Sequence, residues 1–495
     1  MTKMDDVHGS QYSPFVAFIY LFNLMVGTGC LALPSVLLKG GWFLGGFFIV
    51  IVAFLSYVSV TFMLEAMATA NAVIRLRSKG GLEEFVLLSE ESGTLKGDGS
   101  LEDMSQLHPT ASDTHLFQII RRTELGEMAG LFFNEWGMII FYTILILYLI
   151  GDSVIYSTLV ARSLSVFFDD FTPTERSFDL YLGIFFCVSL PLCFFDFQKT
   201  KLLQMTTLAI RNLSLYTMIV LSAMKLVKRG RQDTDVPVAN IAALPNLFGG
   251  AVYSFMCHHS LPGIITPMKD KSNLQRIVQF AFGSVIVVYL LLFVTSGLAF
   301  GLEGIKDPLT FNFPPKQYGF LGDCLFLFPV FTLSSSFPML SITLRNNLDT
   351  LIQHISQKVT HGNAPSDTIV STSQSKTGYR RILMTLLAVI PPTVLCYIAE
   401  HAEVSVDELV GFTGAFAGCA VMLIIPASLV YCSRREFAKA YAKAWNHQKT
   451  ISKPATPKNI HQSPFSGHVW VLAILVWAGL SVLFNLFEDW ELSKK

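Results

Sequence analysis

The sequence contains few charged residues for its length. Only 15% of its 495 residues are Asp, Glu, Lys or Arg, whereas 52% are hydrophobic. A soluble domain typically carries about 25% charged residues. The 36 basic and 36 acidic residues cancel, so no net positive charge favours a nucleic acid as partner. This composition excludes an ordinary soluble domain and predicts a protein of the lipid bilayer.

Features of secreted proteins are also missing. The eight cysteines lie in or beside apolar stretches, so they do not indicate the disulfide framework of a small secreted domain. Residues 1–14 are polar, and the apolar run after them is too long for the core of a cleaved signal peptide. The apolar runs are solid rather than alternating, which argues against membrane-spanning strands. We therefore expect the first apolar run to remain as a membrane helix.

Long apolar runs dominate the rest of the sequence. A helix needs about 20 apolar residues to cross a bilayer, and eleven stretches qualify, although the fourth is short and the sixth is interrupted. The sequence therefore predicts an all-α polytopic membrane protein with about eleven transmembrane helices. The predicted spans are 15–38, 42–68, 136–160, 179–197, 203–226, 246–267, 277–301, 319–343, 382–399, 409–432 and 467–487.

Basic residues are distributed unevenly over the predicted loops. If the N-terminal segment 1–14 is cytosolic, 24 of the 36 Lys and Arg residues face the cytosol, 11 face the other side, and Arg211 lies within a span. An excess of Lys and Arg on the cytosolic side is the rule for multi-pass proteins. We therefore expect the N-terminus in the cytosol and the C-terminus on the opposite side.

Three of the predicted cytosolic segments are long and polar. Residues 72–127 and 344–380 are rich in Ser, Thr, Gly, Asp and Lys and have little apolar period, so we expect both loops to be largely disordered. Residues 433–466 are interpreted as a cytosolic linker before the last helix. Such loops are compatible with binding of a regulatory partner.

A short acidic dileucine match lies in the first of these loops. Glu83, Leu87 and Leu88 have the spacing of a cytosolic signal that a sorting adaptor reads, although matches of this length are frequent by chance. The match favours a lysosomal or endosomal membrane. The plasma membrane is the alternative location.

The first predicted span contains residues that a simple anchor does not need. These residues are Asn23, Gly27, Thr28, Gly29 and Pro34. Glycine destabilises a helix interior by about 1 kcal/mol and permits unusual backbone angles, so Gly-Thr-Gly predicts an unwound stretch. At membrane depth such a stretch must be buried in protein or line a cavity, where its free N–H groups suit a carboxylate and its carbonyls a cation. Close packing of helices through small residues is the alternative explanation.

The sixth predicted span contains a matching interruption. Gly249 and Gly250 lie near its start and Pro262 and Gly263 beyond its middle, with several polar residues between them. Breaks in the first and sixth helices, with one helix left over, are typical of a transporter built from a 5+5 inverted repeat. The repeats would comprise residues 15–226 and 246–432, followed by a last helix at 467–487.

These two spans resemble those of a known family. Residues 23–34 resemble the first-helix motif of the amino acid/auxin permease family, and residues 254–258 (Ser-Phe-Met-Cys-His) resemble its sixth-helix motif. Residues 195–201 and 343–347 are similar to one branch of it, the transmembrane protein 104 family. The resemblance covers nearly all of the membrane-embedded chain. It implies a LeuT-like fold and ion-coupled transport of amino acids.

The resemblance also implies a substrate site between the two broken helices. In the family, the amino and carboxylate groups of the substrate lie against the unwound parts of helices 1 and 6. Core packing is the alternative role for Phe255. The matching positions in this sequence are Gly27, Thr28 and Gly29 in the first span and Ser254, Phe255, Cys257 and His258 in the sixth.

Sodium is one of two coupling ions that the sequence leaves open. Asn23 matches a family asparagine that is associated with cation binding in sodium-coupled members. The hydroxyl groups of Thr332, Ser335 and Ser336 in the eighth span are further candidate oxygen ligands. Hydroxyl groups in membrane helices also bond to their own backbone, which is the alternative role of these three residues.

The proton is the other candidate coupling ion. Ionisable groups inside a membrane are costly and therefore functional candidates, and Asp152, Glu65 and His258 could each carry a proton. Arg211 in the fifth span favours a different interpretation of the carboxylates. An ion pair of Arg211 with Asp152 or Glu65 would neutralise the charge and fix the helix register.

The sequence therefore favours a secondary transporter over an enzyme. No nucleophile motif is present, and no His/Cys spacing supplies the three or four ligands of a zinc site, so we predict neither a metal centre nor a cofactor. The predicted function is H⁺- or Na⁺-coupled transport of a small zwitterion, an amino acid, by alternating access. The alternative is an amino acid sensor or scaffold that keeps the fold without transporting.

Overall fold

The computed structural model describes residues 11–78, 116–168, 176–194, 201–233, 235–361, 378–446 and 457–492. These residues are mostly helical, and a single isolated β-bridge is the only strand-like pairing among them. Eight described helices are long and apolar enough to cross a membrane, or nine if one bent pair counts as a single span. The protein is therefore an all-α, multi-pass membrane protein, as the sequence predicts.

Each of the eleven predicted spans corresponds to one helix or to a series of consecutive helices. The first six are α1 (Pro14–Met25) with α2 (Gly29–Gly40), α3 (Trp42–Arg77), α7 (Glu135–Phe167), α8 (Ser177–Leu192), α9 (Lys201–Arg229), and α10 (Leu244–Ser254) with α11 (Leu261–Ile265). The last five are α12 (Leu274–Gly304), α14 (Phe320–His361), α15 (Gly378–His401), α16 (Val406–Thr413) with α17 (Ile425–Asn446), and α18 (His468–Leu492). The helix α8 and the pair α10–α11 are not among the eight or nine candidate spans, so the total of eleven stays a prediction.

Proline marks the points where several of these helices begin. Pro14, Pro245 and Pro262 occupy the first turn of α1, α10 and α11. A proline is tolerated there because the first N–H groups of a helix have no intrahelical partner. Pro262 therefore restarts the sixth span after its interruption.

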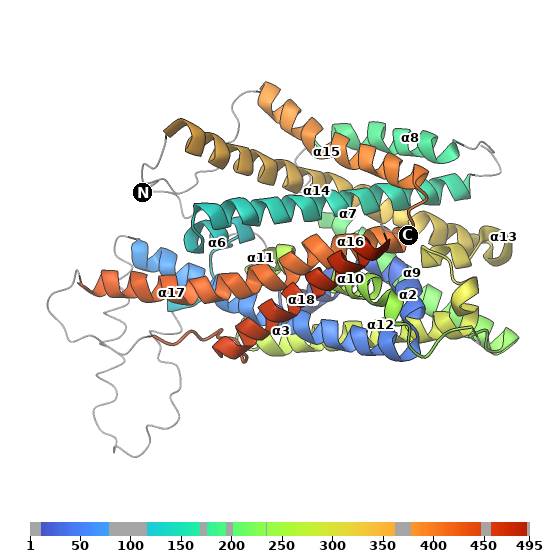
Figure 1. Ribbon diagram of the computed structural model, residues 1–495, viewed down its shortest axis with the longest axis horizontal. Coiled ribbons are helices and arrows are strands. Elements are labelled where there is room, and N and C mark those ends of the chain that lie inside the picture. The colour runs from blue at the N-terminus through green and yellow to red at the C-terminus, as the bar shows by residue number, and fades with distance from the viewer. Residues whose placement is uncertain are drawn as a thin grey trace, which may run out of the picture.

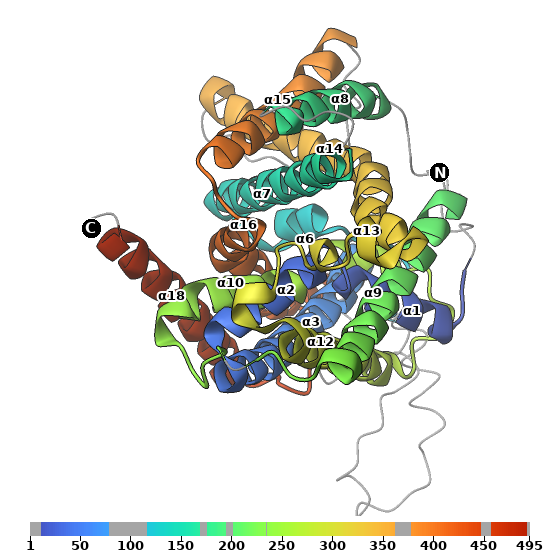
Figure 2. The ribbon, with the colours of Figure 1, turned by 90° about the vertical axis from the view of Figure 1, so that its right-hand side faces the viewer.

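The helices form two groups (Figures 1 and 2). In the first group α7 packs along α14, and both α8 and α15 pack against this pair. In the second group α12 contacts α1, α2 and α3, and α10 contacts α2 and α3. The helix α9 contacts both groups because it packs against α12 and α14. Both interrupted helices thus belong to the second group, and α16 connects α10 to α7 of the first.

Large apolar side chains cover the outside of these groups. Such side chains avoid water in a soluble protein, and here they lie where lipid would contact the helices. Examples with more than half of their surface exposed are Phe43, Leu147, Leu213, Phe280 and Leu472.

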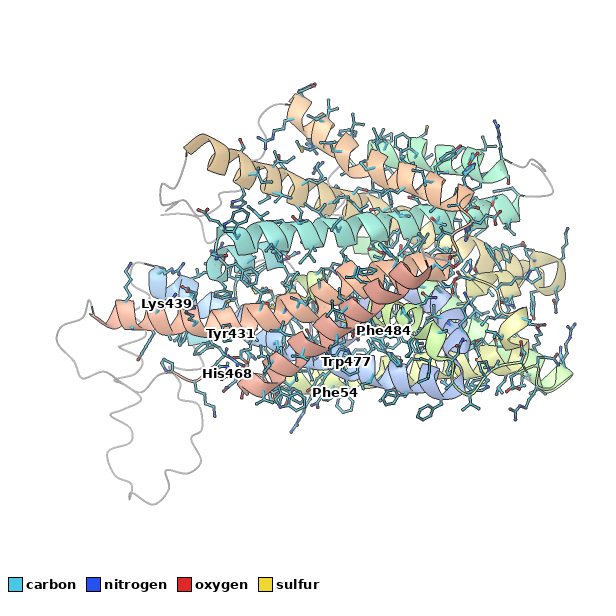
Figure 3. The ribbon with its side chains drawn as sticks, viewed as in Figure 1. Phe54, Tyr431, Lys439, His468, Trp477 and Phe484 are labelled. Atoms are coloured by element: carbon cyan, nitrogen blue, oxygen red, sulfur yellow. The ribbon has the colours of Figure 1, made fainter. Side chains whose placement is uncertain are left out.

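The last helix runs beside α17 in Figure 3, and Figure 2 shows that it lies at one edge of the protein. The ring of His468 at its start lies 6.2 Å from that of Tyr431 on α17, and the ring of Trp470 lies 6.2 Å from that of Phe54 on α3. Much of its apolar surface remains exposed, including Leu480 and Leu483. This placement agrees with a helix added outside the two groups.

The polar loops are more ordered at their ends than the sequence predicts. In the loop expected to be largely disordered, residues 72–77 continue α3, and the segment from residue 116 onward contacts the buried Asn71. The side chain of Asn71 accepts a hydrogen bond from the N–H group of Arg121 (2.9 Å) and donates one to its carbonyl (3.1 Å). A further helix, α6 (Leu125–Phe132), follows at once.

The other two predicted cytosolic segments also contain helix. The helix α14 continues to His361 and α15 begins at Gly378, so the prediction of disorder is wrong at both ends of 344–380. The guanidinium of Arg380 lies 2.6 Å from the carboxylate of Asp349, which joins these helix ends. In the predicted linker 433–466, residues up to Asn446 belong to α17.

Candidate functional site

The first interrupted span bends by 55° between α1 and α2, with residues 26–28 as the break. The predicted interruption is confirmed, but the reason for its glycines differs from the expectation, because none has a positive φ. A Cβ atom on Gly29 would lie 2.9 Å from Cα of Ser254, whereas one on Gly27 would lie 3.8 Å from its nearest neighbour. Gly29 therefore permits close approach of α10, and Gly27 has room to spare.

Side chains from other helices bind the carbonyl groups at the end of α1. The last four carbonyls of a helix have no intrahelical partner and carry the negative end of the helix dipole. Arg211 of α9 donates from Nη1 to the carbonyls of Asn23 (3.3 Å) and Val26 (3.4 Å). The hydroxyl of Tyr289 on α12 lies 2.8 Å from the carbonyl of Met25. The carbonyl side of the first break is thus closed by protein groups.

The opposite side of the same break is open. Among the described residues, no group accepts a hydrogen bond from the backbone N–H of Thr28 or Gly29. Free N–H groups at the start of a helix attract negative charge, because the positive end of the helix dipole adds to their own. The start of α2 can therefore receive a carboxylate.

The second interrupted span is also confirmed. Its first half, α10, ends at Ser254, and a short 3₁₀ turn at His258–Ser260 precedes α11. The hydroxyl of Ser56 donates to the carbonyl of Phe255 (3.1 Å). The Tyr289 hydroxyl lies 3.0 Å from the carbonyl of Ser254, so one hydroxyl group contacts the carbonyls of both breaks.

Polar side chains in the second break lack partners. His258 is fully buried, and neither of its ring nitrogens has a hydrogen-bond partner among the described residues. Nδ1 of His259 is also buried without a hydrogen-bond partner among the described residues, and the thiol of the preceding residue Cys257 is fully buried. The hydroxyl of Ser254 instead donates to the carbonyl of Gly250 on its own helix (2.8 Å).

Phe255 packs into the hydrophobic core. Its ring lies 6.3 Å from that of Phe282 and 5.4 Å from that of Tyr289, both on α12. The sequence leaves two roles open for Phe255, a substrate contact and core packing, and these ring contacts show core packing. A substrate contact by Phe255 stays a prediction.

A buried carboxylate connects α7 to both interrupted spans. Asp152 accepts a hydrogen bond from the hydroxyl of Tyr253 on α10. That hydroxyl lies 3.0 Å from Oγ1 of Thr28 in the first break and can accept the threonine proton. Asp152 is only 6% exposed, and no Lys, Arg or His of the described residues forms an ion pair with it. Among the described residues, the hydroxyl of Tyr253 is thus the hydrogen-bond partner of this buried carboxyl group.

The predicted sodium ligands make contacts with protein groups instead. The hydroxyls of Thr332, Ser335 and Ser336 all donate to backbone carbonyls of α14 at 2.8 to 2.9 Å. Ser335 also lies 3.1 Å from the hydroxyl of Thr207 on α9. The side chain of Asn23 donates to the carbonyl of Ile19 (2.7 Å) and accepts from Asn212. These contacts match the alternative role, in which hydroxyl groups bond to their own helix.

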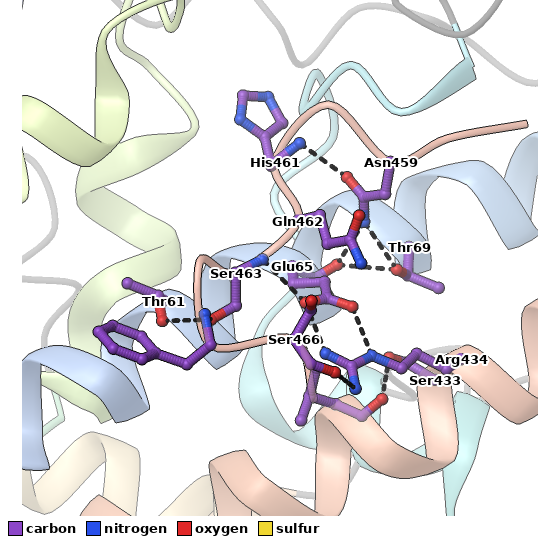
Figure 4. Close-up of polar contacts among 12 residues, drawn as sticks. Thr61, Glu65, Thr69, Ser433, Arg434, Asn459, His461, Gln462, Ser463 and Ser466 are labelled. Atoms are coloured by element: carbon purple, nitrogen blue, oxygen red, sulfur yellow. Dashed lines mark hydrogen bonds and ion pairs between the residues drawn. The ribbon is translucent and has the colours of Figure 1, made fainter. Parts of the chain in front are cut away.

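The predicted ion pair of Arg211 is wrong. Glu65 pairs with Arg434 of α17 through two hydrogen bonds of 2.6 and 2.9 Å, and it also accepts one from the N–H of Ser463 (Figure 4). Asp152 pairs with no arginine, and Arg211 binds carbonyls at the end of α1. The carboxylate of Glu65 is therefore a structural group that joins α3, α17 and the segment before α18.

The same segment is held to α3 by further hydrogen bonds (Figure 4). The side chain of Asn459 donates to the carbonyl of Glu65 (3.2 Å) and to the hydroxyl of Thr69 (3.1 Å). The hydroxyls of Ser463 and Thr61 lie 2.7 Å apart. Residues 457–467 therefore cross over α3 in a fixed position, which a loose linker would not do.

Two titratable groups outside the spans have shifted pKa values. Burial, with Lys271 nearby, lowers the pKa of His461 to about 4. At the other end of the protein, burial and the neighbouring Asp407 raise the pKa of Asp307 above its usual value. Lys39 pairs with Asp407, whose N–H donates to Asp307 (2.6 Å). The chain thus contains buried titratable groups near both ends of α12.

Two functional candidates were missed by the sequence reasoning. Tyr253 and Tyr289 connect the two breaks to each other and to Asp152, yet neither was singled out. A signal for Tyr253 was present, because it directly precedes the sixth-helix motif at 254–258. Tyr289 lies in an unremarkable apolar span, and only its position in space shows its role.

Two further predictions concern the sorting signal and metal binding. Glu83, Leu87 and Leu88 lie outside the described residues. Within the described ranges, no group of three or more His, Cys, Asp and Glu side chains is placed to hold a metal ion. The candidate site is therefore the polar region between the two breaks.

Comparison with known proteins gives the family. The family model for "Transmembrane amino acid transporter protein" matches residues 10–79 and 116–452. The chain belongs to this family. Similar curated proteins include the transmembrane protein 104 homolog of Drosophila melanogaster, 35% identical and covering 96% of this chain and 97% of that protein. Transmembrane protein 104 of Homo sapiens is 33% identical, with 96% of both chains covered.

Solved structures give a weaker likeness. A crystal structure of a mutant of the Eremococcus coleocola manganese transporter is 14% identical and covers 98% of this chain and 99% of that chain, with a TM-score of 0.44. This TM-score is too low to carry a fold assignment. The membership of this transporter family therefore rests on the sequence match, and the all-helical membrane fold on the helices themselves.

Proposed function

We propose that the protein is a proton-coupled secondary transporter of an amino acid that works by alternating access. Membership of the amino acid transporter family supports transport over catalysis. The observation that carries the proposal is the contact chain from Asp152 through Tyr253 to Thr28. This chain joins a buried carboxyl group to both interrupted spans, which is where a proton could be coupled to a bound solute.

The substrate site of this proposal lies between the two breaks. The free N–H groups of Thr28 and Gly29 would bind the carboxylate of the amino acid. His258 and the backbone at Cys257 would contact the rest of the solute, since the His258 ring is buried without a protein partner. A ligand there would satisfy polar groups that the protein leaves unsatisfied.

The proton carrier of this proposal is Asp152. An ionised carboxylate without a cationic partner is costly to bury, so a proton stabilises it in the closed site. Loss of that proton would change the contact of Asp152 with Tyr253 and thereby the position of α10. Substrate and proton would in this way act on the same helix.

The repeat organisation is part of the proposal. We infer a LeuT-like arrangement in which residues 15–226 and 246–432 are the two inverted repeats and 467–487 is the extra helix. The breaks in the first helix of each predicted repeat support it, because inverted-repeat transporters place their sites at such positions. In this arrangement the second helix group rocks against the first.

The membrane orientation and address also belong to the proposal. The excess of Lys and Arg in the loops on one side supports a cytosolic N-terminus. The dileucine match at Glu83, Leu87 and Leu88 supports recognition by a sorting adaptor and a lysosomal or endosomal membrane over the plasma membrane. An acidic lumen would supply the proton gradient that Asp152 needs.

Uptake into proteoliposomes tests the function. The purified protein is reconstituted, and uptake of a labelled amino acid mixture is measured with either a pH gradient or a Na⁺ gradient. We expect uptake with the pH gradient alone. Asp152→Asn should abolish concentrative uptake but keep exchange of labelled for unlabelled amino acid, because the neutral amide preserves the site. The exposed Asp270→Asn is the matched control and should transport normally.

Other outcomes would contradict the proposal in distinct ways. Uptake driven only by a Na⁺ gradient would show that Na⁺, not the proton, is the coupling ion. Full pH-driven uptake by Asp152→Asn would show that Asp152 is not the proton carrier. Amino acids that raise the melting temperature of the folded protein without any uptake would favour the sensor or scaffold. A direct assay of chemical change in the added amino acids excludes or reveals an enzyme.

A further inference from the structure

The carbonyl side of the first break contains a positive charge supplied by the protein itself. Nη1 of Arg211 lies 3.3 Å from the carbonyl of Asn23 and 3.4 Å from that of Val26. These carbonyls lie at the negative end of the α1 dipole, where a cation is favoured. In transporters with broken helices, unwound carbonyls of this kind coordinate the coupling cation.

Arg211 differs from three arginines that join neighbouring helices through a carboxylate. Arg162 pairs with Glu400, Arg380 pairs with Asp349, and Arg434 pairs with Glu65. No carboxylate of the described residues pairs with Arg211. Among the described residues, its hydrogen-bond partners are therefore carbonyl dipoles at the end of α1.

The groups that would complete a sodium site are engaged elsewhere. The side chain of Asn23 is bound to Ile19 on its own helix and to Asn212, the neighbour of Arg211 on α9. Ser335 on α14 meets Thr207 of α9, one helical turn before Arg211. The predicted sodium site takes its ligands from α1 and α14. The helix α9 instead places its own polar groups against both of these helices.

From these contacts we propose that Arg211 is the resident cation of the first break and that this chain binds no Na⁺ there. The residues present do not fit a sodium ion, because an ion at these carbonyls would lie beside a fixed charge of the same sign. Sodium would then not be the coupling ion at this position, and the proton stays the coupling ion of the proposed function. This inference deepens the proposed function, but its test does not depend on transport.

Thermal stability in different salts tests the inference. The melting temperature of the purified protein is measured in sodium, potassium and choline chloride at equal ionic strength. We expect the wild type to melt at the same temperature in all three. Arg211→Ala should melt lower in choline, and low-millimolar guanidinium or sodium should raise its melting temperature by about 2–4 °C, because an added cation replaces the missing charge.

Matched variants keep the test decisive. Arg276→Ala removes an exposed arginine of α12 and should show neither the loss nor the rescue. If Arg211→Ala fails to fold, Arg211→Gln keeps most of the side chain without its charge and should show the same dependence on added cations. Arg211→Lys should behave as the wild type in all salts.

Two results would overturn the inference. One is a rise in the melting temperature of the wild type in sodium over potassium and choline. The other is an Arg211→Ala or Arg211→Gln protein that folds and melts identically with and without added cations. If the salts act as expected and no gradient drives uptake, the proposed function fails while the role of Arg211 stands.

Discussion

The two interrupted helices differ in what binds their free polar groups. In the first break, side chains of α9 and α12 contact the carbonyls of Asn23, Met25 and Val26. In the second, both ring nitrogens of His258 are buried without a partner. Buried polar groups are costly when unsatisfied. The carbonyl side of the first break is therefore complete as it stands, whereas the second break contains a buried ring without a partner among the described residues.

The largest expected effect comes from filling the contact between the two breaks. In Gly29→Val the new Cβ would lie 2.7 Å from Oγ and 2.9 Å from Cα of Ser254, so α2 and α10 must separate. Overpacking of this kind costs about 1–3 kcal/mol or more. We expect a large loss of monodisperse protein in detergent. Gly27→Ala is the control and should keep wild-type yield, because a Cβ there has free space.

Equal losses in the two glycine variants would contradict this comparison. They would show that both glycines serve the same packing or the same backbone conformation. A stable Gly29→Val protein that fails only in transport would instead place Gly29 in the substrate site, as the sequence predicted.

The second effect comes from removing the hydroxyl that contacts both breaks. Tyr289→Phe leaves the carbonyl of Ser254 without a donor, whereas the carbonyl of Met25 still accepts from the N–H of Gly27 (2.7 Å). A buried group left without its partner costs about 1–3 kcal/mol. We expect a lower melting temperature by several degrees. Tyr57→Phe is the control, because its hydroxyl contacts only the exposed side chain of Gln279. Equal melting of Tyr289→Phe and wild type would show that the breaks are held together by packing alone.

The sequence predicted the helices and the breaks, and it missed the contacts between them. Apolar runs fix where a chain can cross a membrane, and each of the eleven predicted segments contains helix in its described part. The partner of Glu65 is Arg434, 369 residues away, and no local pattern specifies such a pair. Arg211 was assigned to a carboxylate because charge pairing is the simplest rule. The end of a helix is an alternative partner that appears only once α1 is seen to stop at Met25.

A smaller effect on stability is expected at His461, a buried histidine outside the spans. Burial and the nearby Lys271 lower the pKa of His461 from 6.5 to about 4, so the folded protein favours the neutral ring. The unfolded chain takes up a proton near pH 6.5, and folding stability is lost as the pH falls below that value towards 4. By pH 5 the loss is about 2 kcal/mol. His461→Asn should reduce the drop in melting temperature between pH 7 and pH 5, and an unchanged drop would assign it to other groups.

The smallest effect on stability is expected at His258 itself. Because neither ring nitrogen has a partner, replacing the ring with an apolar side chain of similar size removes an unsatisfied group and breaks no hydrogen bond. His258→Leu should therefore melt at or slightly above the wild-type temperature, in contrast to Tyr289→Phe. The same variant should lose the rise in melting temperature that a bound amino acid gives the wild type. A marked loss of stability without ligand would mean that the protein already satisfies His258, and the contrast between the two breaks would then disappear.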